Sequence, residues 1–444
     1  MPLPDLIEIV PLEKPVQAQI TVPGSKSITN RALILAALGE GETTLMGALW
    51  SEDTQVMVEC LQELGFMVNV AADRHEPCNR TITVYGKRGA VPGGGTEARP
   101  LELFVGNAGT VARFLAALVC LGSGVYRLHG VPRMHERPQA ALFHALRELG
   151  YRIESANDKL PALIQGGGPR AAGCRVSIQE SSQFASALLL CAGAGQWQVS
   201  VSGENAEESP YVAMTSKMVA AFPRAGGGFQ IEPDASNASY FWAASFLSCF
   251  WEPLQLVRSQ TKPFPARVHA PASSVEIKGG PASDWQVDAA FPRHLPLPAA
   301  VSRRRDLGDS IMTAIVLAPF SQEPVFFTDL GRLRAQECER VAALRTELTR
   351  CGVKVVEDGD TLTVWPGQLR GAEIETYNDH RMAMCFAILG LKVPGIRLKN
   401  PSCVKKTFPN FFQKLAARPP SGLGAKILEG KSGRVLADAE LFAE

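Results

Sequence analysis

Six stretches of the chain share one pattern, in which a polar residue is followed by an almost uninterrupted run of apolar residues. They are rich in Ala and begin at Ser25, Asn107, Ser181, Asp234, Asp309 and Asn378. Ser, Asn and Asp are the residue types that cap helix N-termini. A helix that is apolar on nearly every side must be buried. The pattern therefore predicts six buried helices, each capped by its polar residue.

Alternating runs of apolar and polar residues follow these segments, at 43–49, 125–131, 197–203, 253–259, 324–330 and 395–401. Such alternation is typical of half-exposed strands. A second, amphipathic helix and further strands are predicted within 54–70, 138–155 and 338–365. Pro223 interrupts the third unit, and residues 263–298, rich in Pro and Ser, are predicted to form loops. The chain thus reads as an α/β protein of six similar units, three in each half.

Basic residues lie at or near several of the predicted helix starts, namely Lys26, Arg31, Arg113 and Arg381. Arg137 and Arg340 lie before or at the start of further predicted helices. The first N–H groups of a buried helix need partners, so N-termini that face a shared cleft would favour phosphate or carboxylate. Lys adds a point charge and Arg adds a fork of two donors. The repetition favours an anion site over ordinary surface charges.

Two acidic residues near the predicted helix starts, Asp309 and Glu337, can each have either a structural or a catalytic role. Asp309 is either an N-cap or a general acid or base. Glu337 either complements a helix N-terminus or transfers a proton. The pattern alone leaves both choices open, and His380, between Asp379 and Arg381, is given no catalytic role.

Length and composition narrow the class of protein. The chain has 444 residues, which favours two domains, and its net charge of +1 gives no general attraction to nucleic acid or to an anionic membrane. The ten Cys form no CxxC pair and are expected to be buried, reduced thiols of a cytoplasmic protein. Neither a secretory signal, a nucleotide P-loop, a GxSxG motif nor a metal-ligand spacing is found. The apolar run at 235–251 contains Asn and several Ser, which predicts a buried helix rather than a membrane span.

Eight motifs, in this order, resemble those of the 5-enolpyruvylshikimate-3-phosphate (EPSP) synthase family, the 3-phosphoshikimate 1-carboxyvinyltransferases. They span residues 20 to about 415 and read PGSKSITNRALILAAL, LFVGNAGTVARFLAAL, GVPRMHERP, SSQF, EPDASNASYFWAA, ECERVAAL, YNDHRMAMCFA and CVKKTFPNFF. The resemblance implies a two-lobed inside-out α/β barrel, the enolpyruvyl transferase fold, with six βαβαββ-like units. One lobe would hold residues 24–233 and the other residues 1–23 and 234–444, with crossovers near Pro23–Gly24 and Pro233–Asp234. The lobes would close over a cleft.

The same resemblance implies transfer of the enolpyruvyl group of phosphoenolpyruvate to the 5-hydroxyl of shikimate 3-phosphate, by a monomer with no cofactor. It places at phosphoenolpyruvate Lys26, Gly109, Arg137, Gln183, Arg340, Arg381 and Lys406. It places at shikimate 3-phosphate Lys26, Ser27, Arg31, Ser181, Ser182, Gln183, Tyr211, Asp309, Arg332 and Gln336. Asp309 matches the family's proton acceptor and Glu337 a carboxylate for proton transfer at the enol carbon. A side chain at Gly109 should crowd phosphoenolpyruvate and its mimic glyphosate.

Three positions depart from the family pattern. Gln336 stands where Lys is common, Arg332 where Asn is common and Glu208 where Ser is common, while residues 264–305 follow the family poorly. All three substitutions fall on the shikimate-phosphate side, so acceptor binding or glyphosate sensitivity is expected to differ from the common form.

Three other functions have weaker support in the sequence. An enolpyruvyl transferase for another acceptor, such as UDP-N-acetylglucosamine, is disfavoured by the motifs PGSKS, SSQ and NDHRMAM. An RNA 3′-phosphate cyclase would need a nucleotide site and a catalytic His, and neither is evident. A non-catalytic homologue would not need to keep Lys26, Asp309, Glu337 and Arg381 together.

Overall fold

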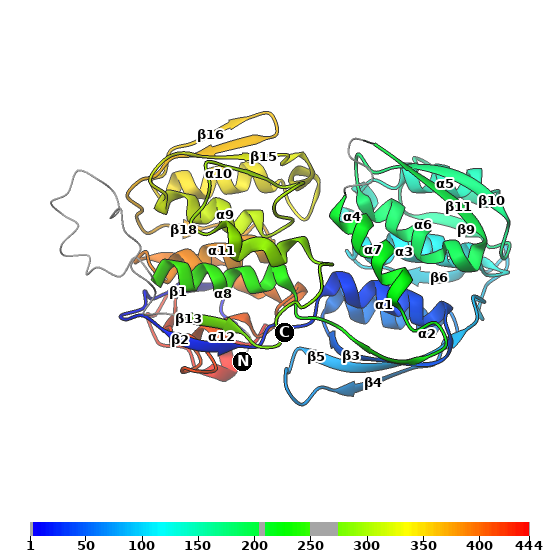
Figure 1. The fold of residues 1–444 in the computed structure, drawn as a ribbon, viewed down its shortest axis with the longest axis horizontal. Helices are drawn as coiled ribbons and strands as arrows, with labels where there is room; N and C mark the ends of the chain where they lie inside the picture. Colours follow the sequence, from blue (N-terminus) through cyan, green and yellow to red (C-terminus); the bar gives the residue numbers. More distant parts are fainter. Residues whose placement is uncertain (1–2, 204–208, 249–273, 444) are drawn as a thin grey trace. The chain divides into compact units, whose positions relative to one another are not determined.

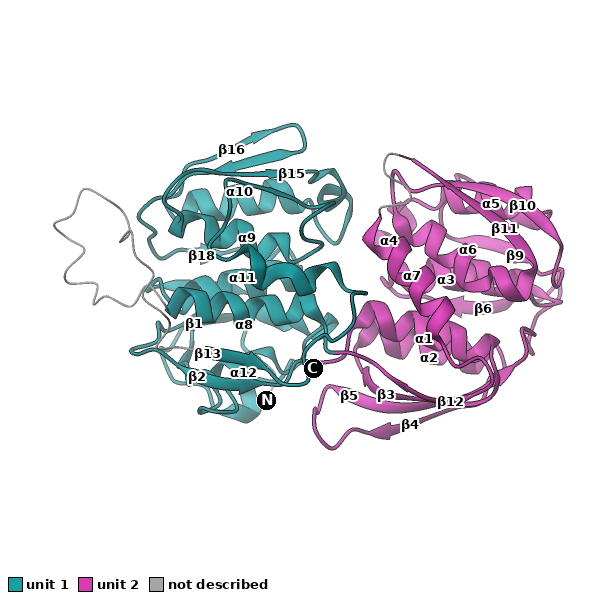
Figure 2. Ribbon diagram, in the orientation of Figure 1, with its two compact units in different colours: residues 1–22, 233–444 teal, residues 23–232 magenta. Residues whose placement is uncertain are grey.

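The computed structural model describes residues 3–203, 209–248 and 274–443. The chain divides into two compact units, one of residues 1–22 and 233–444 and the other of residues 23–232 (Figure 2). The polypeptide therefore passes from one unit to the other twice. The predicted strand at 253–259, Glu208 and Cys249 lie outside the described residues.

The unit of residues 23–232 has three helices at its centre (Figure 1). These are α1 (Lys26–Leu38), α3 (Gly109–Cys120) and α6 (Ser182–Gly195), which pack against one another and are buried along most of their length. Strands lie against them in sheets of order β12-β3-β5-β4, β6-β7-β9-β8 and β10-β11. The strands are β3 (Glu40–Leu49), β4 (Val68–Ala72), β5 (Asn79–Lys87), β6 (Leu101–Phe104), β7 (Val125–His129), β8 (Arg152–Glu154), β9 (Ala162–Gln165), β10 (Ala172–Ser177), β11 (Trp197–Ser202) and β12 (Gly227–Gln230). The remaining helices are α2 (Glu52–Glu63), α4 (Pro132–Glu136), α5 (Ala140–Glu148) and α7 (Pro210–Ala221).

The unit of residues 1–22 and 233–444 follows the same plan. Its central helices α8 (Ala235–Ser248), α9 (Ile311–Leu317) and α11 (His380–Gly390) pack together, beside sheets β18-β19-β1-β20, β13-β2 and β14-β15-β17-β16. Its strands are β1 (Leu6–Ile9), β2 (Gln17–Ile20), β13 (Ser274–Ile277), β14 (Ala300–Ser302), β15 (Val325–Thr328), β16 (Val355–Asp358), β17 (Thr361–Val364), β18 (Glu373–Ile374), β19 (Ile396–Lys399) and β20 (Ile427–Glu429). It also contains α10 (Arg340–Arg350), α12 (Phe411–Ala416) and the 3₁₀ turns η2 (Val287–His294), η3 (Ala318–Phe320), η4 (Gly331–Ala335), η5 (Pro401–Lys406) and η6 (Asp438–Glu440).

The sheets repeat one pairing scheme. In each four-stranded sheet the first two strands in the order pair parallel, and the next two pairs are antiparallel. The two-stranded sheets β10-β11 and β13-β2 keep the parallel pair alone. The sheet β10-β11 belongs to the third of the six repeats, whose apolar stretch begins at Ser181. There α7 ends just before Pro223, and no antiparallel hairpin follows. The recurrent buried helix and parallel strand pair are thus common to both halves of the chain.

Three of the predicted helix starts are displaced. The N-cap of α3 is Ala108 rather than Asn107, that of α9 is Ser310 rather than Asp309, and that of α11 is Asp379 rather than Asn378. At α3, Gly106 adopts a left-handed conformation (φ 53°) and a turn joins the Ala108 N–H to the Val105 carbonyl, which places Asn107 before the helix.

The prediction of loops over 263–298 is wrong for part of its described residues. Residues 274–277 form β13, and residues 287–294 form η2. Strand β13 pairs with β2 in the parallel register Ser274 to Gln17, so its partner is supplied by the beginning of the chain and local composition could not reveal it. Turn η2 accommodates Pro292, since a short 3₁₀ turn needs few consecutive backbone donors.

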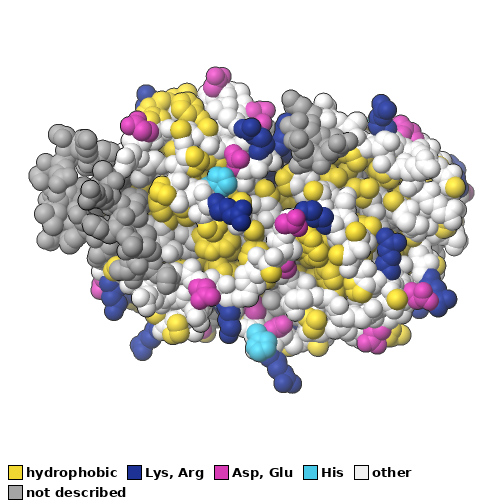
Figure 3. All heavy atoms as spheres, viewed as in Figure 1, with side chains coloured by type: hydrophobic (Ala, Val, Ile, Leu, Met, Phe, Trp, Pro, Cys, Tyr) yellow, Lys and Arg dark blue, Asp and Glu magenta, His cyan; other side chains and the backbone are white. Residues whose placement is uncertain are grey.

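The burial of α8 and of the cysteines, and the mixture of charges on the surface, agree with the expectations from composition. Helix α8 is buried as predicted, and no helix within the described ranges is long and apolar enough to cross a membrane. The nine Cys that the structure describes are all free thiols, and eight of them are buried. On the face in Figure 3, basic and acidic side chains are interspersed, in keeping with the small net charge.

Candidate active site

Lys26 is the first residue of α1 and is held by an acidic partner. Its Nζ donates to Asp53 Oδ2 at 2.9 Å, and the two side chains are 18% and 6% exposed. Asp53 lies in the first turn of α2, where a carboxylate also complements the helix N-terminus. The ion pair fixes the direction of the ammonium group. Sequence reasoning missed Asp53, although an acidic residue directly before a predicted amphipathic helix was a visible signal.

Arg31, five residues further along α1, is buried in a network that joins three helices. Its guanidinium donates to Thr215 Oγ1 at 2.8 Å, to Ser186 Oγ at 3.0 Å and to the Ser27 carbonyl at 2.8 Å. Burial lowers the pKa of Arg31 to about 10, which leaves it charged at neutral pH. The network ties α1 to α6 and α7 near the starts of α1 and α6, and it holds the backbone at Ser27.

Two guanidinium groups converge on the start of α3 at Gly109. A Cβ at Gly109 would lie 2.5 Å from Arg113 Nη1 and 2.6 Å from Arg137 Nη2. Arg113 is buried and donates through Nη2 to the Pro138 carbonyl at 2.7 Å, while Arg137 Nη1 donates to the Asn107 carbonyl at 3.1 Å. Burial, and then the charge of Arg137, lower the pKa of Arg113 well below its usual range. Two cations at a helix N-terminus make a strongly electropositive place.

The start of α6 adjoins the start of α3. Ser181 caps α6, and its Oγ accepts from the Gln183 N–H at 3.2 Å. The Gln183 side chain donates to Thr110 Oγ1 at 3.3 Å, which links the first turns of the two helices. Ser182 is buried, and Tyr211 lies in the first turn of α7, where its carbonyl accepts from Thr215. In this unit the fold thus brings together Lys26, Ser27, Arg31, Gly109, Arg137, Ser181, Ser182, Gln183 and Tyr211 around the starts of α1, α3, α6 and α7.

In the other unit, Asp309 is gripped by two arginines. Arg303 Nη2 lies 2.9 Å from Asp309 Oδ1, and Arg381 Nη2 lies 3.1 Å from Asp309 Oδ2. Burial acts to raise the pKa of Asp309, but Arg381, Arg303 and Arg340 together outweigh it and hold the pKa well below its usual range. The carboxylate is therefore ionised at neutral pH. Arg303 was not among the predicted site residues.

The backbone around Asp309 is fixed by a second carboxylate, that of Asp288 in η2. Asp288 Oδ1 accepts from the N–H groups of Gly308 and Ser310, at 2.7 and 3.1 Å, and from Ser310 Oγ at 2.5 Å. Its Oδ2 accepts from Ser236 Oγ on α8. Asp288 thereby fixes the backbone just before α9, on both sides of Asp309, and the Asp309 side chain contacts the arginines. Sequence reasoning missed Asp288 because it lies in the segment predicted to be loop.

Glu337 belongs to a chain of ion pairs. Its Oε1 lies 3.2 Å from Lys406 Nζ, and its Oε2 lies 2.7 Å from Arg340 Nη2. Arg340 also contacts Asp379 at 2.7 Å, and Asp379 accepts from the Arg381 N–H at 2.8 Å as the N-cap of α11. Burial acts to lower the pKa of Arg340, but Asp379 and Glu337 outweigh it and raise the pKa. The predicted residues Glu337, Arg340, Arg381 and Lys406 therefore lie in one connected cluster.

The departures at 332 and 336 lie beside this cluster. Arg340 Nη1 donates to Gln336 Oε1. A Lys at 336 could not accept this hydrogen bond and would bring a second positive charge to Arg340. Arg332 lies in η4, and Arg334 of the same turn pairs with Glu339 and Glu357 at 2.5 and 2.7 Å. Gln336 thus serves as a neutral partner for Arg340.

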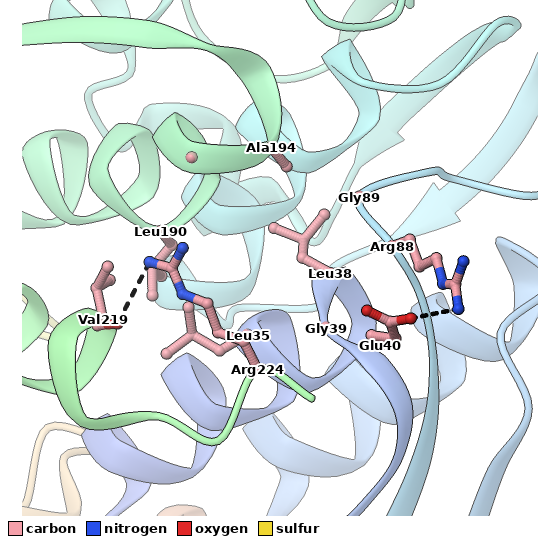
Figure 4. A pocket seen from close by; sticks show the side chains of 11 residues that line it. Leu35, Leu38, Gly39, Glu40, Arg88, Gly89, Leu190, Ala194, Val219 and Arg224 are labelled. Carbon is pink, nitrogen blue, oxygen red and sulfur yellow. Dashed lines mark hydrogen bonds and ion pairs between the residues drawn. The ribbon is translucent and has the colours of Figure 1, made fainter. Parts of the chain in front are cut away.

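A cavity of about 300 Å³ lies elsewhere in the unit of residues 23–232 (Figure 4). Leu35, Leu38 and Leu190 form its apolar wall, and Arg88 and Arg224 lie among its lining residues. It adjoins the C-terminal end of α1, about 18 Å along that helix from Lys26 at 1.5 Å per residue. It contains none of the predicted site residues.

Comparisons with known proteins define the class through the fold. The structure matches an EPSP synthase from Acinetobacter baumannii with a TM-score of 0.71 at 20% sequence identity, covering 95% of this chain and 99% of that one. It also matches the enolpyruvyl transferase NikO from Streptomyces tendae with a TM-score of 0.64 at 16% identity, covering 96% and 99%. The fold is therefore that of the enolpyruvyl transferases, which confirms the predicted fold class.

Sequence comparison identifies the family. The model of EPSP synthase (3-phosphoshikimate 1-carboxyvinyltransferase) matches residues 10–415. A 3-phosphoshikimate 1-carboxyvinyltransferase of Nostoc sp. is 38% identical, covering 92% of this chain and 98% of its own. One of Aeromonas salmonicida is 35% identical, covering 90% and 96%. The chain belongs to the EPSP synthase family.

Proposed function

We propose that this protein transfers the enolpyruvyl group of phosphoenolpyruvate to the 5-hydroxyl of shikimate 3-phosphate and releases phosphate, a step of the shikimate pathway to chorismate. Membership of the EPSP synthase family supports the reaction. The observation that carries the proposal is the contact of the Asp309 carboxylate with two arginines, beside the Lys406–Glu337–Arg340 cluster. Such a site combines a base with cations for an anionic substrate.

Phosphoenolpyruvate carries a phosphate and a carboxylate, and both need cationic partners. We assign them to Lys26, Gly109, Arg137, Gln183, Arg340, Arg381 and Lys406. The convergence of Arg113 and Arg137 on Gly109 supports this assignment, because two guanidiniums there lack a carboxylate partner among the ion pairs of the described residues. Shikimate 3-phosphate is assigned to Lys26, Ser27, Arg31, Ser181, Ser182, Gln183, Tyr211, Asp309, Arg332 and Gln336. Arg31 would act chiefly through the backbone of Ser27, since its own donors are engaged.

The chemistry needs one proton removed and one delivered. The acceptor oxygen bonds to C2 of phosphoenolpyruvate as its proton leaves, and a proton is added at the methylene C3. Loss of a C3 proton and of phosphate then restores the double bond. Asp309 would accept the hydroxyl proton, and Glu337, paired with Lys406, would exchange the proton at C3. Lys26 and the arginines would stabilise the negative charge of the departing phosphate.

Release of phosphate from phosphoenolpyruvate tests the proposal. We expect release that depends strictly on shikimate 3-phosphate, with none when UDP-N-acetylglucosamine replaces it. Release with the sugar nucleotide would favour the transferase for another acceptor, and no release with either would favour a binding role. The further expectations of a cytoplasmic monomer that works without a cofactor belong to the same proposal.

Gly109→Ala is expected to weaken phosphoenolpyruvate binding. The added Cβ would meet two guanidinium groups at 2.5 and 2.6 Å, so Arg113 and Arg137 must shift. We expect the KM for phosphoenolpyruvate to rise about tenfold, equal to about 1.4 kcal/mol, and the inhibition constant of glyphosate to rise as well. Steady-state kinetics measures both. Gly173→Ala is the control, because its Cβ would meet neighbours only at 3.7 Å or more; equal effects in both variants would contradict the assignment.

A further inference from the structure

We infer that Arg303 is a positioning residue for Asp309, which holds one carboxylate oxygen in place while the other is released to the acceptor hydroxyl. The inference deepens the proposed function and rests on it. Arg303 lies in the segment that follows the family motifs poorly, so neither pattern nor resemblance assigned it a role. Its guanidinium is 8% exposed and lies 2.9 Å from Asp309 Oδ1.

The backbone of Arg303 is fixed at the end of β14. Its N–H donates to the Thr328 carbonyl at 3.1 Å, which extends the pairing of β14 with β15 by one residue. A tight turn follows, in which the Ser302 N–H donates to Asp306 Oδ2 at 2.7 Å and the Asp306 N–H donates back to the Ser302 carbonyl at 3.0 Å. Ser302 Oγ donates to Asp329 Oδ2 at 2.5 Å. These hydrogen bonds therefore fix the position of the Arg303 backbone, from which the side chain extends to Asp309.

The carboxylate that Arg303 contacts is equally well placed. Asp288 holds the backbone on both sides of Asp309, so the distance between Arg303 and Asp309 is set from both ends. Arg303 Nε is buried and has no hydrogen-bond partner among the described residues. A buried guanidinium with an unused donor is stabilised mainly by its ion pair, which makes the contact with Asp309 its principal interaction in the described structure.

The two arginines at Asp309 differ in what else they are expected to do. Arg381 is assigned to phosphoenolpyruvate and lies in the first turn of α11, where its N–H donates to Asp379. If Arg381 turns to the substrate, Asp309 Oδ2 loses a partner and can accept a proton. Arg303 has no assigned substrate contact, so Oδ1 keeps its partner. The two oxygens of the Asp309 carboxylate thus have different roles: Oδ1 stays bound to Arg303, and Oδ2 accepts the proton.

The charges that face Asp309 come from three elements of this unit. They are Arg303 after β14, Arg381 on α11 and Arg340 on α10, all positive, while Asp288 on η2 bonds to the adjoining backbone and Tyr240 on α8 contacts Arg381. Removing Arg303 takes away a contacting cation. The carboxylate should then protonate at higher pH, because an adjacent cation favours the charged form of an acid.

The experiment compares Arg303→Met and Arg303→Lys with Arg305→Met, a matched control two residues away whose side chain is exposed. For Arg303→Met we expect kcat to fall about 100-fold, as for loss of one oriented donor, with little change in the KM for phosphoenolpyruvate. The acid limb of the pH profile of kcat should move to higher pH. Arg303→Lys should recover part of both effects, and Arg305→Met should match the wild type.

A second readout does not need turnover. Titration of the Asp309 carboxyl by ¹³C NMR, with its resonance identified by its loss in Asp309→Asn, should show a higher pKa in Arg303→Met than in the wild type. An active wild type with an unchanged kcat, pH profile and carboxyl titration in folded Arg303→Met would overturn the role of Arg303. A wild type without acceptor-dependent phosphate release would instead refute the proposed function, whatever the titration shows.

Discussion

Lys26→Ala should reduce kcat/KM by at least about 10³-fold while the protein stays folded. The ammonium group is assigned to both substrates, and loss of a single preorganised hydrogen-bond donor to one developing charge already costs about 10²–10³-fold. The substitution also leaves Asp53, which is 6% exposed, without its cation, so a negative charge would remain where anions must bind. Steady-state kinetics with both substrates, together with thermal unfolding, gives the result.

Two companion variants show what causes the loss. Lys87→Ala removes an exposed Lys of β5 and should leave kcat/KM unchanged. Lys26→Ala with Asp53→Asn removes both members of the ion pair, so recovery of activity in this double variant would assign the loss to the unpaired Asp53. We expect the double variant to stay inactive. Near-normal activity in Lys26→Ala itself would refute the assignment of Lys26.

Asp309→Asn should lower kcat about 10²–10⁴-fold, the range for a general base, with a much smaller effect on the KM for phosphoenolpyruvate. Asn has nearly the same shape but cannot take up the hydroxyl proton, and it leaves Arg303 and Arg381 without their shared counter-charge. Single-turnover kinetics separates this loss from slower product release. A kcat within a few-fold of the wild type would exclude Asp309 as the proton acceptor.

The comparison with Glu337→Gln assigns the second proton. In D₂O, exchange at C3 of phosphoenolpyruvate during turnover requires the acid at the enol carbon. We expect exchange to be lost in Glu337→Gln, whose carboxylate contacts Lys406 and Arg340. If deuterium exchange at C3 persisted in Glu337→Gln and disappeared in Asp309→Asn, the proton transfer at C3 would be assigned to Asp309 rather than to Glu337.

The low pKa of Asp309 also determines how this residue makes the stability of the folded protein depend on pH. A carboxyl whose folded pKa is depressed contributes stability above its unfolded pKa, about 3.9 for Asp, and loses it only as the pH falls through the folded value. The ion pairs of Asp309 therefore persist throughout the neutral range. An acid limb of wild-type activity near neutral pH would accordingly belong to another group, and the shift expected for Arg303→Met concerns the acid limb that lies well below neutral pH.

The central helices could be predicted from the sequence because each contains a long apolar run that begins close to a residue of the capping types. Three of their starts lie one residue later than predicted, and at α3 the cause is the local turn at Gly106. At α9 the N-cap is Ser310, which is bonded to Asp288, about twenty residues earlier in the chain, while the side chain of Asp309 pairs with Arg303 and Arg381. Likewise β13 finds its partner β2 only in the folded chain.

The candidate catalytic residues could be predicted from the sequence more completely than the side chains that hold them in place. Motifs identified Lys26, Asp309, Glu337 and Arg381 as candidates, because their residue types and surroundings are distinctive. The side chains that hold them have ordinary neighbours in the sequence. Asp53 and Arg303 become visible only when the fold brings them to Lys26 and Asp309, and Arg31 is tied to Ser186 and Thr215, more than 150 residues away.

The most direct test of the account identifies the product. With phosphoenolpyruvate and shikimate 3-phosphate, NMR of the product should show an enolpyruvyl ether on the oxygen at C5, formed in equal amount with phosphate. Pyruvate and phosphate with unchanged shikimate 3-phosphate, or an ether at another oxygen, would contradict the account.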